Sequence, residues 1–203
     1  FIVAVAYSKT EVLQVAVFSA VLLGEHVTAL SAAAIVLTSI GVMLLSVTPA
    51  ATSARSWLSP SALLGIGSGA GFAISAIGYR AAALKLGPMA PWLAGAYVLV
   101  WAQAIQSILL GGYLAWRQPQ ALGTIMREWR TSLLAGFAGA LASFGWFTAF
   151  AMRNAADVRT LALVEVLYGY AVSWRIFKEK ISGKESLGIL LLILGIALIS
   201  AQF

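Results

Sequence analysis

The sequence predicts an all-α, polytopic membrane helix bundle. Of its 203 residues, 61% are hydrophobic and only 10% are charged, whereas about a quarter of the residues in a soluble domain are charged. A helix crosses the hydrocarbon core with about 20 mostly apolar residues, and several segments of the chain meet that length. A transmembrane barrel would instead need short strands of alternating polarity, and the apolar run Leu187–Ile199 does not alternate.

Seven spanning segments are predicted, joined by short polar links. Prolines and glycines mark several of these links, as in Ser59-Pro60 and Gly87-Pro88. Tryptophans lie near several segment ends, as in the aromatic belts of membrane proteins. The predicted segments cover residues 1–24, 28–47, 57–81, 88–115, 131–152, 157–178 and 184–202.

An internal repeat relates the beginning of the chain to its end. A shift of 154 residues lays Glu11-Val12-Leu13 on Glu165-Val166-Leu167 and Glu25 on Glu179, and ten of the 36 positions from 11 to 46 are identical. A general apolar bias does not explain matched glutamates. Because the chain crosses the membrane an odd number of times between Glu25 and Glu179, the two copies are expected to be inverted, an arrangement that recurs in secondary transporters.

The repeat also predicts the organisation of the chain. Residues 1–47 are expected to be the last two helices of a first repeat, 48–56 a linker, and 57–203 a second repeat of five helices. By the same count, three further helices, about 95 residues, are expected before the chain, so that a complete protein would have ten helices.

Several stretches resemble the EamA module of the drug/metabolite transporter superfamily. They are Leu23–Thr28 followed by Gly41–Leu45, Glu165–Ser182 followed by Gly195–Ile199, Gly71–Ser75 with Tyr79-Arg80, and Trp146–Met152. The resemblance implies an N-terminally incomplete member with two inverted five-helix repeats around a central cavity. It also implies an integral protein of the bacterial cytoplasmic (inner) membrane. Val12 and Val166 stand where this family often has proline, so the sequence does not predict a proline kink there.

Glu165 is the first candidate for a functional residue. It is predicted about 10 Å inside its helix, where an ionisable group costs several kcal/mol unless it faces protein or water. Tyr168 lies on the same side at helical spacing. The alternative is a structural carboxylate that is bonded to a neighbouring helix.

Glu11 is the second candidate. It shares one helical face with Tyr7, Thr10 and Gln14, which predicts a polar stripe lining the same cavity. If the helix begins near Ser8 instead, Glu11 lies closer to the membrane interface.

Other polar and aromatic side chains within predicted segments complete the candidate set. Tyr79, Trp101 and Trp146 are suited to stacking on an aromatic or cationic substrate, and Gln103 to a hydrogen bond with substrate or with another helix. The alternative for the aromatic residues is packing within the bundle. For Arg80, Arg153 and Arg159, near helix ends, anchoring at lipid headgroups is the expected role.

No catalytic residue, metal site or cofactor is predicted. The chain has no cysteine and a single histidine, His26, too few of the usual ligands for a metal site. Its 13 Lys and Arg are spread along the chain and do not form the dense stripe that follows nucleic-acid phosphates. The expected partners are a small-molecule substrate and the lipid bilayer, with protons and a second copy of the chain as further candidates.

The expected function is therefore secondary transport of a small metabolite or drug-like solute by alternating access. A membrane-embedded binding or scaffold protein that does not transport is the rival hypothesis. Orientation stays open, because the excess of Lys and Arg in the links near 47–57, 116–130 and 175–184 places those links in the cytoplasm, whereas the resemblance implies a cytoplasmic C-terminus.

Overall fold

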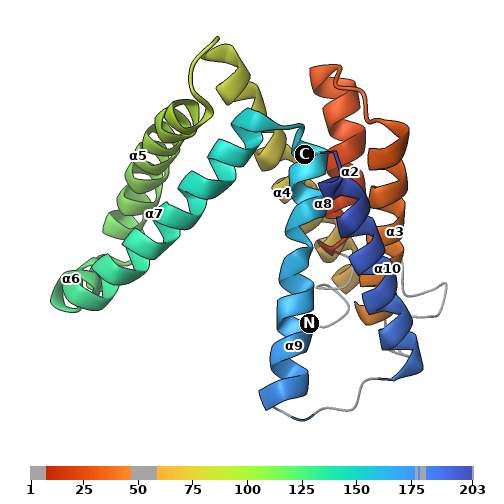
Figure 1. Cartoon of the computed structure of the whole chain (residues 1–203). Coiled ribbons are helices and arrows are strands. Elements are labelled where there is room, and N and C mark those ends of the chain that lie inside the picture. Colours follow the sequence, from red (N-terminus) through yellow and green to blue (C-terminus); the bar gives the residue numbers. More distant parts are fainter. Residues whose placement is uncertain (1–7, 47–58, 177, 179–181, 203) are drawn as a thin grey trace. The chain divides into compact units, whose positions relative to one another are not determined.

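The computed structural model describes residues 8–46, 59–176, 178 and 182–202. Within these ranges every regular element is a helix and no strand occurs (Figure 1). The prediction of an all-α chain is thus confirmed. The elements are α2 (Glu11–Phe18), the π-helix η1 (Ser19–Leu23), α3 (Ala29–Ser46), α4 (Pro60–Lys85), α5 (Pro91–Arg117), α6 (Pro119–Arg127), α7 (Trp129–Met152), α8 (Ala155–Ala162), α9 (Val164–Ile176) and α10 (Gly183–Ser200).

Five of the described helices are long and apolar enough to cross a membrane: α3, α4, α5, α7 and α10. They match five of the seven predicted spans. The predicted span 1–24 is described only from residue 8, as α2 and η1. The predicted span 157–178 occurs as two successive helices, α8 and α9.

The interruption between α8 and α9 falls at Leu163 and involves no proline. The Thr160 hydroxyl donates to the Ala156 carbonyl oxygen at 2.7 Å, a bond that competes with the helical ladder and tends to bend helices. In the next turn the amides of Leu163 and Val166 bond three residues back, to Thr160 and Leu163, which is the tighter 3₁₀ pattern. The helix is therefore interrupted at Leu163, three residues before Val166, where the resemblance noted above would place a proline.

The chain divides into two compact units, Phe1–Gly78 with Asn154–Phe203, and Tyr79–Arg153. The division falls inside α4, and helices of both predicted repeats belong to the first unit. The repeat boundaries near residues 47 and 57 stay a prediction.

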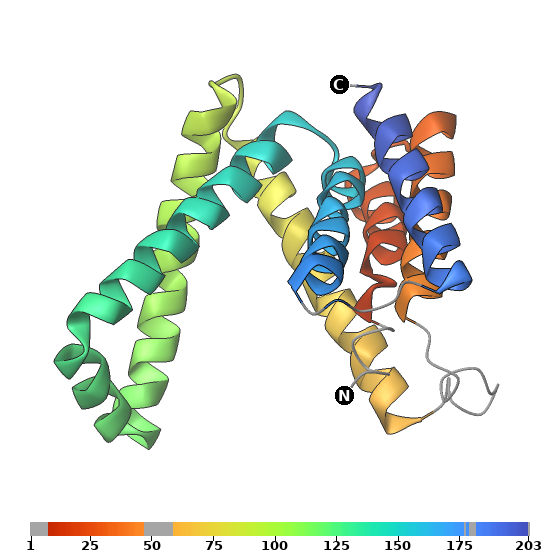
Figure 2. The same ribbon diagram turned by 60° about the horizontal axis from the view of Figure 1, so that its bottom comes forward.

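The first unit is built on the packing of α3 against α10, which run side by side in two views (Figures 1 and 2). Glycines lie where the two backbones meet. A Cβ added at Gly195 would lie 2.5 Å from Thr38 Cγ2 and 2.9 Å from the Ala34 carbonyl oxygen, and one added at Gly41 would lie 2.8 Å from the Gly188 carbonyl oxygen. Small residues permit such close approach, which is a main source of helix association in membranes.

The contacts between α3 and α10 are reciprocal. Gly41, late in α3, meets Gly188, early in α10, while Gly195, late in α10, meets Ala34, early in α3. The two helices are therefore antiparallel. The 154-residue shift carries Gly41 onto Gly195 and Ala34 onto Gly188, so one contact maps onto the other, as self-complementary contacts around a twofold axis must.

The second unit is organised by the packing of α5 against α7. A Cβ added at Gly95 would lie 2.6 Å from Thr148 Oγ1. The ring of Tyr79 lies 4.1 Å from that of Phe147. Arg80 donates to the carbonyl oxygens of Phe150 and Ala151 at 2.8 and 3.1 Å. Arg80 therefore binds carbonyl groups at the C-terminal end of α7, a local role that the expectation of a lipid anchor did not include.

We expect Gly195→Ala to destabilise the protein by about 1–3 kcal/mol, because the added methyl group would force α3 and α10 apart. Gly67→Ala is the matched control, since a Cβ there meets no described atom within 4 Å and alanine favours a helix over glycine. Unfolding in detergent micelles measures both variants. Equal stability of the two variants would contradict this account of the α3–α10 contact.

Candidate functional site

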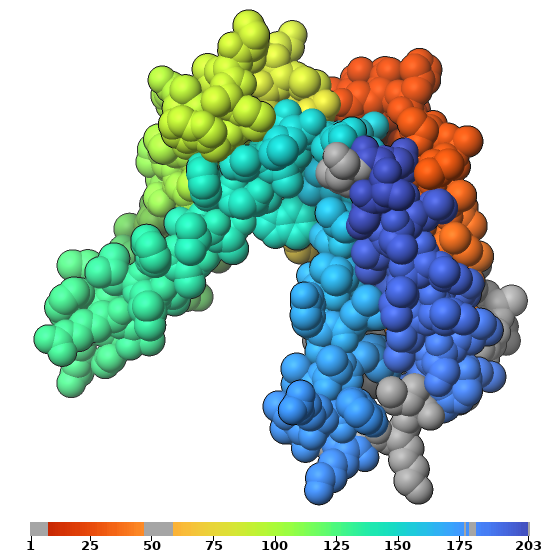
Figure 3. All heavy atoms as spheres, in the orientation of Figure 1, coloured from red at the N-terminus to blue at the C-terminus, as the bar shows by residue number. Residues whose placement is uncertain are grey.

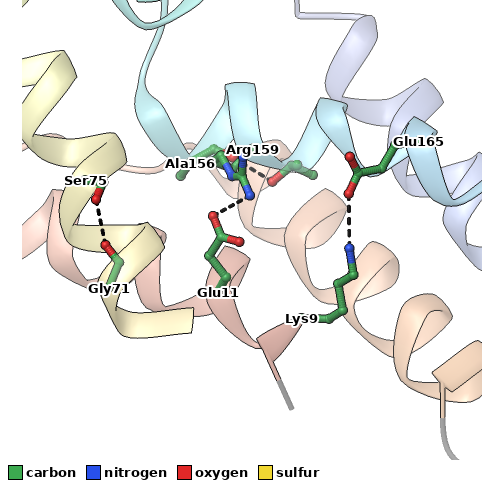
Figure 4. A network of polar contacts seen from close by, with 8 residues as sticks. Lys9, Glu11, Gly71, Ser75, Ala156, Arg159 and Glu165 are labelled. Carbon is green, nitrogen blue, oxygen red and sulfur yellow. Dashed lines mark hydrogen bonds and ion pairs between the residues drawn. The ribbon is translucent and has the colours of Figure 1, made fainter. Parts of the chain in front are cut away.

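A group of polar contacts in the first unit lies where α2 packs against α8, beside the start of α9 (Figure 4). The Glu11 carboxylate on α2 forms an ion pair with the Arg159 guanidinium on α8. Lys9, just before α2, donates from Nζ to Glu165 Oε1 on α9 at 3.0 Å. Two ion pairs therefore join the same two segments of the chain.

These ion pairs connect the two copies of the repeat. Glu11 and Glu165 are equivalent under the 154-residue shift, and each pairs with a cation that lies a few residues before the other glutamate in the sequence. Lys9 precedes Glu11 in the chain, whereas its partner Glu165 follows Arg159, the partner of Glu11. The two segments therefore run antiparallel, as α3 and α10 do. The two equivalent glutamates thus make similar contacts, each with a cation beside the other glutamate's segment.

The two ion pairs differ in burial. The side chains of Glu11 and Arg159 are 10% and 23% exposed, whereas those of Lys9 and Glu165 are 30% and 60% exposed. Val12 and Val15, next to Glu11 on α2, are fully covered. The more enclosed carboxylate is therefore Glu11, the residue that sequence reasoning placed second, because burial depends on the neighbouring α8 and α4 as well as on depth within one helix.

Gln14 extends this polar region toward α4. Its Nε2 donates to Thr10 Oγ1 at 3.0 Å and to the Ile66 carbonyl oxygen at 3.4 Å, so Thr10 and Gln14 share a face of the helix, as predicted. Gly69 on α4 allows the approach, because a Cβ there would lie 3.0 Å from the Ser8 carbonyl oxygen. Tyr7 lies outside the described residues.

A serine and an asparagine connect the beginning of η1 to the beginning of α8. Asn154 caps α8 by accepting from the Ala156 amide at 3.0 Å. Ser19 Oγ lies 2.8 Å from Glu25 Oε2 and 3.2 Å from Asn154 Oδ1, and its single proton can satisfy only one of these acceptors at a time. This contact joins η1 to the N-terminal end of α8, the helix that carries Arg159.

The profile of the EamA-like transporter family matches residues 59–201, more than half of the chain. The chain belongs to the EamA-like transporter family. No curated protein and no solved structure matches it. Membership in the EamA family, together with the five apolar helices, makes this an integral membrane protein of the transporter type.

The EamA match has a direct bearing on the ion pairs. Arg159 and Glu165 lie inside the matched residues, whereas Glu11 and Lys9 precede them. Each ion pair therefore joins the EamA-matched segment to the copy that comes before it in the chain.

The remaining predicted residues are divided between the two units. Tyr168 follows Glu165 by one turn of α9 and is 69% exposed. In the second unit, Tyr79 stacks on Phe147, and the Trp146 ring lies 5.7 Å from that of Phe150, so both make packing contacts. Trp101 is 67% exposed, and Gln103 follows it on α5 with a half-buried side chain. The structure thus brings together Glu11 and Glu165 with their cations and places Gln14 beside them.

Sequence reasoning missed the pairing role of Arg159, and it considered snorkelling or pairing for Lys9 without naming Glu165 as the partner. It assigned Arg159 to lipid anchoring because the residue lies near the start of a predicted helix. It also did not single out Asp157, whose Oδ1 is buried and accepts no hydrogen bond from any described residue. A signal was present, since Asp157, Arg159 and Glu165 form a charged group within one apolar segment, and charges in such segments mark functional sites by default.

We expect Glu11→Gln and Arg159→Gln each to destabilise the protein by about 3–5 kcal/mol, because each substitution leaves its former partner buried without a counter-charge. The double variant Glu11→Gln/Arg159→Gln should lose less than the sum of the two. Unfolding of the purified protein in detergent measures this cycle. The exposed pair is the control, with a loss of at most about 1 kcal/mol on Glu165→Gln. Strictly additive losses at Glu11 and Arg159 would contradict the coupling.

Proposed function

We propose that this EamA protein is a secondary transporter that moves a small metabolite or drug-like solute by alternating access between two inverted repeats. The proposal rests on two ion pairs, Glu11–Arg159 and Lys9–Glu165, that connect the two copies. We further propose the bacterial cytoplasmic membrane as its setting.

The energetics of buried charges support this reading. Bringing two charges out of water costs several kcal/mol per ion, and apolar residues of similar size often stabilise a fold as well or better. Charges within membrane segments are also rare unless they serve substrates, ions or protons. A non-transporting scaffold would gain little from Glu11 and Arg159 at the contact between its two halves.

Alternating access requires contacts that form in one state and break in another. The ion pairs meet this requirement, because they join the two copies and their stability depends on charge. A proton or a charged substrate group that neutralises one glutamate releases the cation of the opposite copy. The conformational equilibrium then shifts by the free energy of the lost pair.

The two glutamates are suited to different steps. We assign Glu165 the coupling of transport to protons, because its ion pair with Lys9 is the less enclosed of the two. Glu11 is 10% exposed and becomes reachable only when Arg159 moves away, so we assign it the control of the conformational change.

The transport function is tested in proteoliposomes that contain the native gene product. The vesicles are loaded with an isotopically labelled metabolite extract, and mass spectrometry identifies the solutes that leave faster than from protein-free vesicles. We expect a small set of related solutes to leave. Release identical to that of protein-free vesicles, from protein that is folded and inserted, would favour the scaffold hypothesis.

For a solute identified in this way, we expect Glu165→Gln to abolish uptake driven by a pH gradient while solute-driven exchange continues. Glutamine keeps the size and hydrogen-bonding capacity of glutamate but cannot titrate. Glu128→Gln, at an exposed link between α6 and α7, is the matched control and should transport normally. Unchanged pH-driven uptake in a stably folded Glu165→Gln protein would remove Glu165 from the coupling step.

A further inference from the structure

The short helix α6 (Pro119–Arg127) is a feature that the sequence analysis did not predict and that the transport proposal does not use. It links the C-terminal end of α5 to the N-terminal end of α7, and it has no buried residue. Figure 3 shows atoms of this segment on the surface of the second unit. Because α5 and α7 are both candidate membrane spans, the helix that joins their ends must lie where they leave the hydrocarbon.

The residues of α6 separate into two faces. At helical spacing, one face carries the apolar residues Ala121, Leu122, Ile125 and Met126. The opposite face carries Gln120, Gly123, Thr124 and Arg127. Ile125 and Met126 are 45% and 75% exposed. The protein therefore leaves the end of the apolar face uncovered, in a helix too short to cross a bilayer.

Tryptophan and arginine flank this helix on both sides. The Arg117 guanidinium carbon lies 4.6 Å from the centre of the Trp116 ring, and that of Arg130 lies 5.5 Å from the Trp129 ring. Trp116 and Trp129 are 76% and 55% exposed. This repeated pair places an amphipathic ring next to a cation, a combination suited to the boundary between acyl chains and headgroups.

The charge of the segment is strongly positive. Arg117, Arg127 and Arg130 stand beside one carboxylate, Glu128. No ion pair joins Glu128 to these arginines among the residues that the structure describes. The three guanidinium groups are thus available to phosphate oxygens, which they bind with two parallel hydrogen bonds.

We propose that α6 and its flanking Trp–Arg pairs form a docking surface for anionic phospholipid headgroups at the membrane surface. Ile125 and Met126 enter the acyl boundary, the indole rings lie at headgroup level, and the arginines bind the phosphates. An apolar face, a belt of tryptophan and unpaired positive charge at the end of two spans all match this one occupant.

The depth of α6 is tested with spin labels in nanodiscs of phosphatidylcholine and phosphatidylglycerol. The chain has no cysteine, so Met126→Cys and Thr124→Cys each provide a single labelling site. We expect the label at position 126 to be several-fold more accessible to oxygen than to a water-soluble nickel chelate, and the label at 124 to show the reverse. Equal exposure of both labels to the chelate would overturn the proposal. So would protection of the 126 label from both reagents, which would indicate a protein partner.

The charge preference is tested with a fluorophore on Met126→Cys and phospholipids that carry a quencher in the headgroup. We expect quenching by phosphatidylglycerol at much lower mole fractions than by phosphatidylcholine. Adding Arg117→Gln/Arg130→Gln should weaken the phosphatidylglycerol effect about 25-fold, since each arginine contributes about fivefold. Lys85→Gln, exposed beyond the opposite end of α5, is the control and should change nothing. Equal quenching by both lipids, or no response to the arginine substitutions, would overturn the proposal.

Discussion

Within a bilayer, apolar side chains gain little by leaving lipid for protein, so helices associate through close backbone contact and polar pairing. The α3–α10 contact of this EamA protein follows that constraint, with Gly41, Gly188 and Gly195 at the points where the two backbones meet. Because these contacts are reciprocal, they set the two copies antiparallel. The antiparallel arrangement in turn brings Lys9 and α2 against α8 and the start of α9, where the two ion pairs between described residues form.

The two glutamates that are equivalent in the sequence repeat lie in different surroundings in the structure. Glu11 and Glu165 are equivalent in the repeat, yet one is enclosed against Arg159 and the other is largely exposed beside Lys9. The difference comes from the partners, since Arg159 belongs to a helix covered by its neighbours and Lys9 precedes its helix. Two equivalent carboxylates in unlike surroundings can take unlike roles, as paired acids in enzymes do.

The arginines of the second unit make contacts of a different kind from that of Arg159. Arg80 binds carbonyl oxygens at the end of α7, and so satisfies backbone groups that a helix end leaves open. Arg117 and Arg130 instead lie over tryptophan rings beside α6. All of these arginines lie near predicted helix ends, while their contacts separate a helix cap at Arg80, an ion pair at Arg159 and stacking on tryptophan at Arg117 and Arg130.

The sequence by itself determined the class of the protein, most of its membrane helices and the internal repeat. These depend on local hydrophobic length and on identities between two segments, which need no knowledge of the fold. It also singled out Glu11, Gln14 and Glu165. Only the tertiary structure decided that Glu11 is the more enclosed glutamate and that Arg159 and Lys9 are the partners, because each pair joins residues about 150 positions apart. The break at Leu163 is likewise visible only in the structure, where the amides of Leu163 and Val166 bond three residues back and no proline in the sequence marks the position.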